Sequence, residues 1–117
     1  MENKKLLVDL AQNSSSLHIT PQIYLRILQK AIDQTSQDIK DMESALPISD
    51  YPKVQTITHK LIGDYENLRI TMLSSLARQM NVMVKAQQDT EKIVLLLNDF
   101  VTYFEQLRQF VAKSKTT

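Results

Sequence analysis

The sequence predicts an all-α fold, an up-and-down antiparallel four-helix bundle with a short extra N-terminal helix. Its 117 residues include one glycine and three prolines, whereas leucine, isoleucine, glutamine and lysine are plentiful, and this composition favours helices. Apolar residues also recur at spacings of three and four in four long segments, which short polar stretches separate. A chain of this length can bury about two-thirds of its unfolded surface, so we expect residues 1–117 to form one domain.

Charge and cysteine content exclude several classes of function. Fourteen basic and 13 acidic residues give a net charge of +1, so no electrostatic footprint for nucleic acid or an anionic membrane stands out. The absence of cysteine excludes disulfides, thiol catalysis and thiolate metal sites, and agrees with a reducing cytosol. No apolar run approaches the roughly 18 residues of a membrane-spanning helix, and residues 1–11 are too polar for a secretory signal. We therefore expect a soluble, cytoplasmic protein with no nucleic-acid or membrane partner.

The first predicted element is a short helix over residues 3–11. Leu6, Leu7 and Leu10 lie there at helical spacing and would pack one leucine edge against the rest of the chain. Residues 12–16 are polar and are expected to form a connector.

A long amphipathic helix is expected over residues 21–46. Thr20 followed by Pro21 is a helix start, because threonine is a good N-cap and proline suits the first helical position. Pro47 ends the helix, because proline lacks the N–H that the interior of a helix needs. The apolar residues follow a three-and-four rhythm and comprise Tyr24, Leu28, Ala31, Ile32, Ile39, Met42, Ala45 and Leu46.

The third helix is expected over residues 51–66. Ser49 and Asp50 offer N-caps for it, and Pro52 is tolerable in its first turn. Its apolar face carries Val54, Ile57, Leu61 and Tyr65. Leu68 continues the same face just beyond the helix, where a turn is expected at residues 67–69.

A fourth helix is expected over residues 70–87, and a last long helix follows a polar break at residues 88–90. Asp89 or Thr90 would cap the last helix. Residues 113–117 are expected to fray. The inner face of the last helix is formed by Ile93, Leu96, Leu97, Phe100, Phe104, Leu107 and Val111.

His59 stands on the side of the predicted third helix that faces away from its apolar residues, given about 100° of rotation per residue. It should therefore face water or a partner. Gly63, the only glycine in the chain, follows four residues later in mid-helix, where glycine costs up to about 1 kcal/mol relative to alanine. This placement indicates a need for open space beside His59.

The fourth helix supplies polar side chains for the same site. Ser74, Arg78, Asn81 and Lys85 lie on the face opposite its core stripe. If the third and fourth helices form an antiparallel hairpin, Asn81 and Lys85 lie near the level of His59, with Arg78 close or diagonal to it. Neutral imidazole is a nucleophile near pH 7, and cations and amides stabilise the charge on a phosphoryl group in transfer. This constellation favours reversible phosphorylation of His59.

The segment His59-Lys60-Leu61-Ile62-Gly63 resembles the H-x-L-K-G signature of histidine-containing phosphotransfer (HPt) domains. The histidine of these domains exchanges phosphoryl groups with the aspartate of response-regulator receiver domains. The likeness covers about residues 17–111 and includes Tyr24-Leu25-Arg26-Ile27-Leu28, Ala45-Leu46, Asp50, Asn67-Leu68-Arg69 and Phe100 through Leu107.

The resemblance implies that His59 is the phosphoacceptor and that Gly63 gives access to it. It places Asn81 near an amide that orients the imidazole or the phosphoryl group. It also implies a monomeric relay without a cofactor, rather than an enzyme. The partner would be the receiver domain of a response regulator or hybrid histidine kinase.

The chain departs from the family pattern at two positions. Ile62 stands where the family has a lysine, and Lys60 points about 100° aside, so Lys60 is a poor direct substitute. Arg69 stands where many members have glycine. We expect Lys85, with Arg78, to supply the missing positive charge.

Ile62 and Lys60 are expected to contribute to the docking surface for the receiver, because small exposed apolar patches mark interaction sites.

Two alternatives remain open from the sequence. The first is a helical adaptor that binds a receiver or kinase without carrying phosphate, which the loss of the lysine at Ile62 favours. The second and weaker one is a small enzyme, for which no carboxylate pair, activated nucleophile or glycine loop is visible. His18 and His59 lack the spacing of a metal site. We expect Met72, Met80, Met83 and Tyr65 to fill the core.

Overall fold

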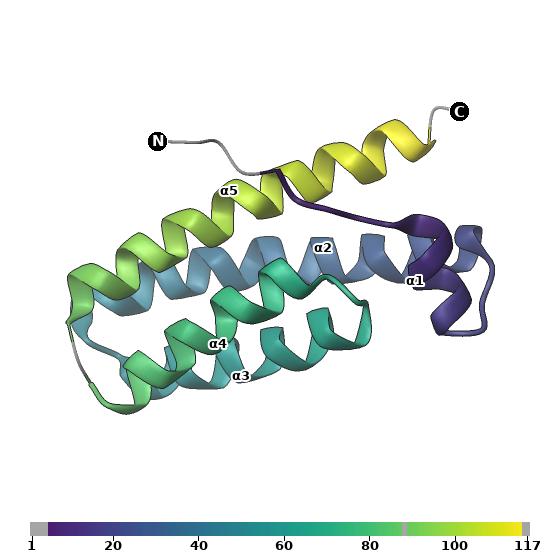
Figure 1. Ribbon diagram of the computed structural model, residues 1–117. Helices are drawn as coiled ribbons and strands as arrows, with labels where there is room; N and C mark the ends of the chain where they lie inside the picture. Colours follow the sequence, from purple (N-terminus) through teal and green to yellow (C-terminus); the bar gives the residue numbers. More distant parts are fainter. Residues whose placement is uncertain (1–4, 88, 116–117) are drawn as a thin grey trace.

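The computed structural model describes residues 5–87 and 89–115 (Figure 1). Five α-helices and one short 3-10 helix make up most of this part of the chain, which contains no β-strand, so the all-α prediction is confirmed. In chain order they are α1 (Leu10–Ser16), α2 (Pro21–Ala45), η1 (Leu46–Ile48), α3 (Tyr51–Asn67), α4 (Thr71–Lys85) and α5 (Thr90–Lys115).

Predicted caps set the starts of three helices. Thr20 Oγ1 accepts a hydrogen bond of 3.2 Å from the backbone N–H of Ile23, and Pro21 opens α2. Asp50 Oδ1 accepts one of 3.3 Å at the start of α3, and Asp89 Oδ1 one of 3.2 Å at the start of α5. Each cap satisfies an N–H that has no partner within its helix. Gln88, in the predicted break before α5, lies outside the described residues.

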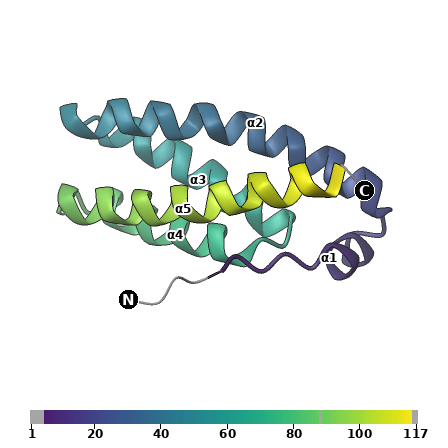
Figure 2. The ribbon, with the colours of Figure 1, turned by 90° about the horizontal axis from the view of Figure 1, so that it is seen from above.

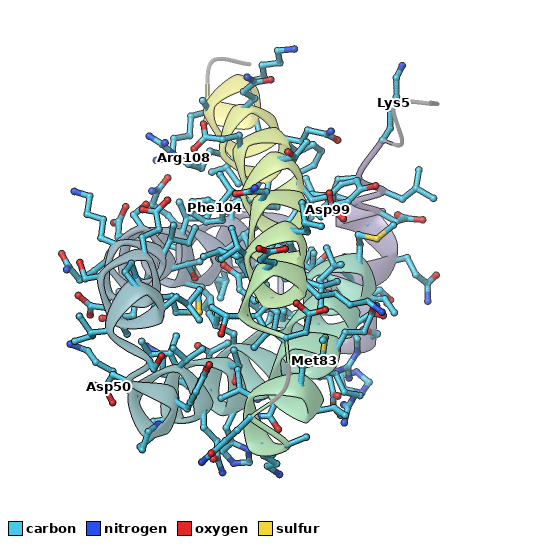
Figure 3. The ribbon with its side chains drawn as sticks, turned by 90° about the vertical axis from the view of Figure 1, so that its left-hand side faces the viewer. Lys5, Asp50, Met83, Asp99, Phe104 and Arg108 are labelled. Atoms are coloured by element: carbon cyan, nitrogen blue, oxygen red, sulfur yellow. The ribbon has the colours of Figure 1, made fainter. Side chains whose placement is uncertain are left out.

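The four longer helices share one core. α2 packs against α3 and α5, and α4 packs against the same two helices (Figures 1 and 2). Figure 3 views them from the end where α2 passes into α3, near Asp50. Met80 is fully buried, whereas Met72 and Met83 are half-buried against the core. The largest fully buried side chains are Tyr24, Tyr65, Phe100, Phe104, Leu28, Met42, Leu61, Ile70, Leu73, Met80, Ile93 and Leu107.

The predicted N-terminal helix over residues 3–11 and the connector over residues 12–16 are wrong. The helix begins at Leu10 and takes in all of the predicted connector. Asp9 caps it, with Oδ1 accepting a hydrogen bond of 2.9 Å from the backbone of Gln12. The described residues before Asp9 form no helix, and Leu6 N donates to the side chain of Gln106 on α5 at 2.6 Å. Residues 3 and 4 lie outside the described part of the chain.

Tertiary contacts explain why the polar segment is helical. Asn13 and Ser14 are buried, and α1 packs against α2. Asn13 Nδ2 donates to the hydroxyl of Tyr24 at 3.2 Å, and this hydroxyl in turn donates to the backbone oxygen of Leu68. The polar side chain of Asn13 therefore holds α1 in place. The leucine spacing had instead predicted a helix further upstream.

The C-terminal helix is longer than expected. The prediction that residues 113–115 fray is wrong, because α5 continues to Lys115; residues 116 and 117 lie outside the described part. Val111 is buried near this end, and Lys115 Nζ donates to Gln29 Oε1 of α2 at 2.6 Å. These contacts hold the last turn against α2.

The turn between α3 and α4 depends on Arg69. Its φ is 63°, the left-handed conformation that favours glycine. Its Nη1 donates to the backbone oxygen of Glu66 at 3.1 Å, and Ile70 N donates to Tyr65 O at 2.9 Å. These bonds satisfy carbonyl groups at the end of α3.

No helix in the described part of the chain has both the length and the apolar character to cross a membrane.

Candidate phosphoacceptor site

His59 lies near the middle of α3 with its side chain exposed, as predicted. Its imidazole makes no hydrogen bond or ion pair with any described residue. Gly63, one turn further along α3, is also exposed, and a Cβ atom added there would meet no atom within 4 Å. The imidazole therefore has open surface beside it on its own helix.

Ile62 is less exposed than expected. The prediction placed it on the outward face, but its side chain is half-buried and packs against the core. About 100° of rotation separates it from Gly63, which brings it to the side of α3 where Thr58 meets α4. Its contribution to a docking surface is limited to the part of the side chain that remains exposed.

Asn81 joins α4 to α3 beside His59. Its Nδ2 donates to Thr58 Oγ1 at 2.9 Å and to the backbone oxygen of Gln55 at 3.3 Å. Both protons of the amide group are thus directed at α3. In this arrangement Asn81 fixes the turn of α3 that carries His59.

The prediction that Ser74 and Asn81 face away from the core is wrong, because both side chains are buried. Short polar side chains fit between two packed helices when their hydrogen bonds are made. Ser74 Oγ donates to the backbone oxygen of Thr71 at 3.1 Å, while Asn81 bonds α3. The sequence pattern placed Ser74 and Asn81 on one edge of α4 but did not predict that their side chains are buried there.

Arg78 and Lys85 remain exposed on that edge of α4. Arg78 forms an ion pair with Glu66 of α3 and makes no side-chain hydrogen bond to His59. Lys85 lies in the last turn of α4, one turn further from the α3–α4 connection than Asn81, so it is not level with His59 as predicted. Its side chain makes no hydrogen bond or ion pair with any described residue. Of these two cations, only Lys85 is without a counter-ion in the described structure.

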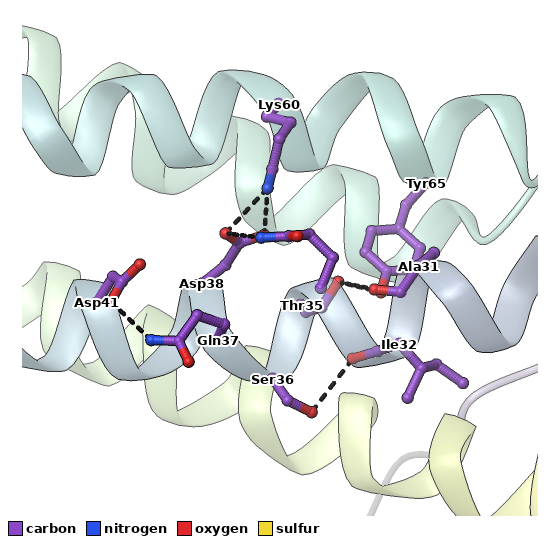
Figure 4. A network of polar contacts seen from close by, with 10 residues as sticks. Ala31, Ile32, Thr35, Ser36, Gln37, Asp38, Asp41, Lys60 and Tyr65 are labelled. Atoms are coloured by element: carbon purple, nitrogen blue, oxygen red, sulfur yellow. Dashed lines mark hydrogen bonds and ion pairs between the residues drawn. The ribbon is translucent and has the colours of Figure 1, made fainter.

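Lys60 faces α2 (Figure 4). Its Nζ donates to Asp38 Oδ1 at 2.9 Å and lies 2.7 Å from Asp38 Oδ2. Gln34 Nε2 donates to the same Oδ1 at 3.2 Å. Burial raises the pKa of Asp64, on the same side of α3, although the charge of Lys60 opposes this shift. Lys60 would have to leave this ion pair in order to take the docking role expected for it.

Sequence reasoning missed Asp38, although a signal was present. Asp38 lies three residues after Thr35 and one before Ile39, within the segment whose inner face is apolar. A carboxylate in that setting needs a cationic partner. Lys60 would then have been the nearest candidate on the third helix.

Buried tyrosines fix the helices around the site. The hydroxyl groups of Tyr65 and Thr35 lie 2.6 Å apart and join α3 to α2 (Figure 4). Burial raises the pKa of Tyr65 and that of Tyr24 above their ordinary values. No cluster of His, Cys, Asp or Glu able to hold a metal ion occurs among the described residues.

No family model, curated protein or solved structure matches this chain. A functional assignment therefore rests on the residues and geometry of the site.

Proposed function

We propose that this chain is a histidine-containing phosphotransfer domain that accepts a phosphoryl group on His59 from a phospho-aspartyl receiver domain and passes it on. One observation carries the proposal. An exposed imidazole without protein partners stands on α3, and open surface at Gly63 follows one turn later. A nucleophile that must meet the aspartate of another protein needs this access.

The fold supports the same assignment. We infer an up-and-down antiparallel four-helix bundle of α2, α3, α4 and α5, with α1 as the extra helix, because short connections join helices that pack against each other. Such a scaffold presents a side chain from mid-helix on a rigid surface.

The transfer proceeds at a ring nitrogen of neutral His59. This nitrogen attacks phosphorus, a P–N bond forms, and the P–O bond to the aspartate breaks, with its electron pair leaving on the carboxylate. The other ring nitrogen keeps its proton. Lys85 and Arg78 supply positive charge for the phosphoryl oxygens, while Asn81 holds the adjacent turn of α3. Because the histidine is modified and then restored by its partners, the domain is a relay rather than an enzyme.

The partner is the receiver domain of a response regulator or hybrid histidine kinase. It docks on the surface around His59, which includes the exposed part of Ile62 and the outer edge of α4. The domain acts as a monomer in the cytoplasm, where such receivers would meet it.

A second candidate is a helical adaptor that binds a receiver or kinase without carrying phosphate. Ile62 stands where the resembled family has a lysine, and the neighbouring Lys60 is engaged by Asp38. This local lack of positive charge on α3 favours the adaptor.

Phosphotransfer from a panel of phosphorylated receiver domains of the same genome tests the proposal. We expect one of them to transfer an acid-labile, base-stable label to the parent protein and not to His59→Gln. His18→Gln is the matched control, because His18 is the other histidine, is also exposed and lies in the connection between α1 and α2. Receiver binding without transfer from any member of the panel would establish the adaptor instead.

A further inference from the structure

Arg78 is about level with His59 in the register of the α3–α4 hairpin. Asn81 is level with Thr58 and Gln55, because its amide bonds both. Arg78 precedes Asn81 by one turn and so lies one turn nearer to the connection between the helices. Its backbone is therefore level with residues 58–61 of α3, which include His59, and its side chain extends toward the connection between the helices to reach Glu66.

His59 and Glu66 share one face of α3. They are seven residues apart, which is about two turns and leaves them nearly aligned along the helix. Gly63 lies between them and has no side chain, and Ile62 is half-buried. No exposed bulky side chain of α3 separates the resting position of the guanidinium from the imidazole.

The ion pair between Arg78 and Glu66 is weak enough for Arg78 to exchange Glu66 for another anionic partner. The side chains are 59% and 49% exposed, respectively. Water and salt screen an exposed pair of this kind, so it contributes little to stability. A phosphoryl group on His59 would offer Arg78 three acceptor oxygens and more negative charge than one carboxylate.

We propose that Glu66 holds Arg78 away from His59 in the unphosphorylated domain, and that Arg78 leaves Glu66 for the phosphoryl oxygens when His59 is phosphorylated. This inference rests on the proposed function and deepens it. Glu66 acts as a resting counter-ion, so the charge beside the imidazole depends on its phosphorylation state. Arg78 thereby supplies, from α4, charge that Ile62 does not supply from α3.

The test follows phosphohistidine formed with phosphoramidate, a small phosphodonor, by 31P nuclear magnetic resonance. The variants are Glu66→Gln, Arg78→Gln and the double variant. Freeing Arg78 by Glu66→Gln should lengthen the phosphohistidine lifetime about two- to fivefold, the range expected for one exposed ion pair. Arg78→Gln should shorten it by a similar factor. The double variant should match Arg78→Gln, because Glu66 acts only through Arg78.

Matched controls are Glu105→Gln and Arg108→Gln on α5. Their ion pair, at 2.9 Å, has side chains that are 49% and 51% exposed, and its loss should leave the lifetime unchanged. If Glu66→Gln lengthens the lifetime equally with and without Arg78, the carboxylate acts by its charge alone, and the exchange is wrong while the relay stands. Equal lifetimes in all variants would also overturn only the exchange. A parent that neither phosphoramidate nor any receiver phosphorylates at His59 overturns both the exchange and the relay.

Discussion

Lys60, the residue that follows His59, is paired with the buried carboxylate of Asp38 on α2, at 2.9 Å from Oδ1 and 2.7 Å from Oδ2. The side chain of Asp38 is 5% exposed and that of Lys60 is 40% exposed. The pair therefore has a buried anion and a half-exposed cation. By drawing Lys60 toward α2, it helps to keep His59 on the outward side of α3.

This asymmetry predicts unequal effects of removing the two partners. Lys60→Met leaves a buried carboxylate without its cation and should lower the free energy of unfolding by about 2 kcal/mol or more. Asp38→Asn should cost less, about 1 kcal/mol, because Lys60 can turn into water. Urea unfolding measures both changes. Arg108→Gln, which breaks an exposed pair, should cost under about 1 kcal/mol, and equal small losses in all three variants would contradict the inferred role of burial.

The effect of Gly63 on the stability of the fold and its effect on access to His59 can be tested separately. Its surroundings hold no atom within 4 Å of an added Cβ, and its backbone is helical. Gly63→Ala should therefore raise the free energy of unfolding by up to about 1 kcal/mol, the difference in helix propensity between the residues. Thermal or urea unfolding would detect it. A destabilised Gly63→Ala would show that the glycine is needed for the fold.

The access role of Gly63 is tested by a larger side chain. Gly63→Gln should slow transfer from a phosphorylated receiver more than it slows labelling by phosphoramidate, because a folded partner needs more room at α3 than a small phosphodonor. Comparing the two donors controls for damage to the imidazole itself. The access interpretation would be wrong if both rates fell by the same factor.

Local signals were sufficient to predict most of the helical fold. Thr20 with Pro21, Asp50 and Asp89 act through hydrogen bonds within three residues, so their effect can be read without knowledge of the tertiary structure. α1 could not be placed in this way, since the burial of Asn13 against Tyr24 depends on contacts between two helices. The leucine spacing further upstream therefore gave the wrong boundaries.

The sequence was enough to predict on which helix faces the candidate site residues lie. It was not enough to predict which of their side chains contact one another. Helical periodicity placed His59 outward and Arg78 on the edge of α4 that faces α3. It could not distinguish the exposed Lys85 from the buried Asn81, because only packing decides which side chains enter the interface. The partner of Arg78 was missed for the same reason.

Lys85 is expected to stabilise the phosphoryl group, because it is an exposed cation on the α3-facing edge of α4 that no described acidic residue neutralises. Lys85→Ala should slow acceptance of phosphate from a receiver about tenfold, the order expected for losing one charged donor to a transferring phosphoryl group. Lys40→Ala, at an exposed site on α2, is the control and should retain the parental rate. If Lys85→Ala accepts phosphate as fast as the parent, Lys85 has no part in the transfer.

The buried hydroxyl of Tyr65 predicts how stability depends on pH. Burial raises its pKa in the folded state, whereas the unfolded chain should titrate near the ordinary value of about 10. Above that pH the unfolded state loses the proton that the folded state keeps, so stability is fully present below about pH 10 and falls as the pH rises. At pH 11, one unit above the unfolded pKa, the stability lost should be about 1 kcal/mol. Tyr65→Phe, which loses the hydrogen bond to Thr35, should cost about 1 kcal/mol at pH 7 but lose less stability between pH 7 and pH 11 than the parent. Guanidinium unfolding at pH 7 and pH 11 measures the stability lost by each protein. Tyr103→Phe, at a half-buried site, is the control. Parallel pH profiles for the parent and Tyr65→Phe would contradict the prediction.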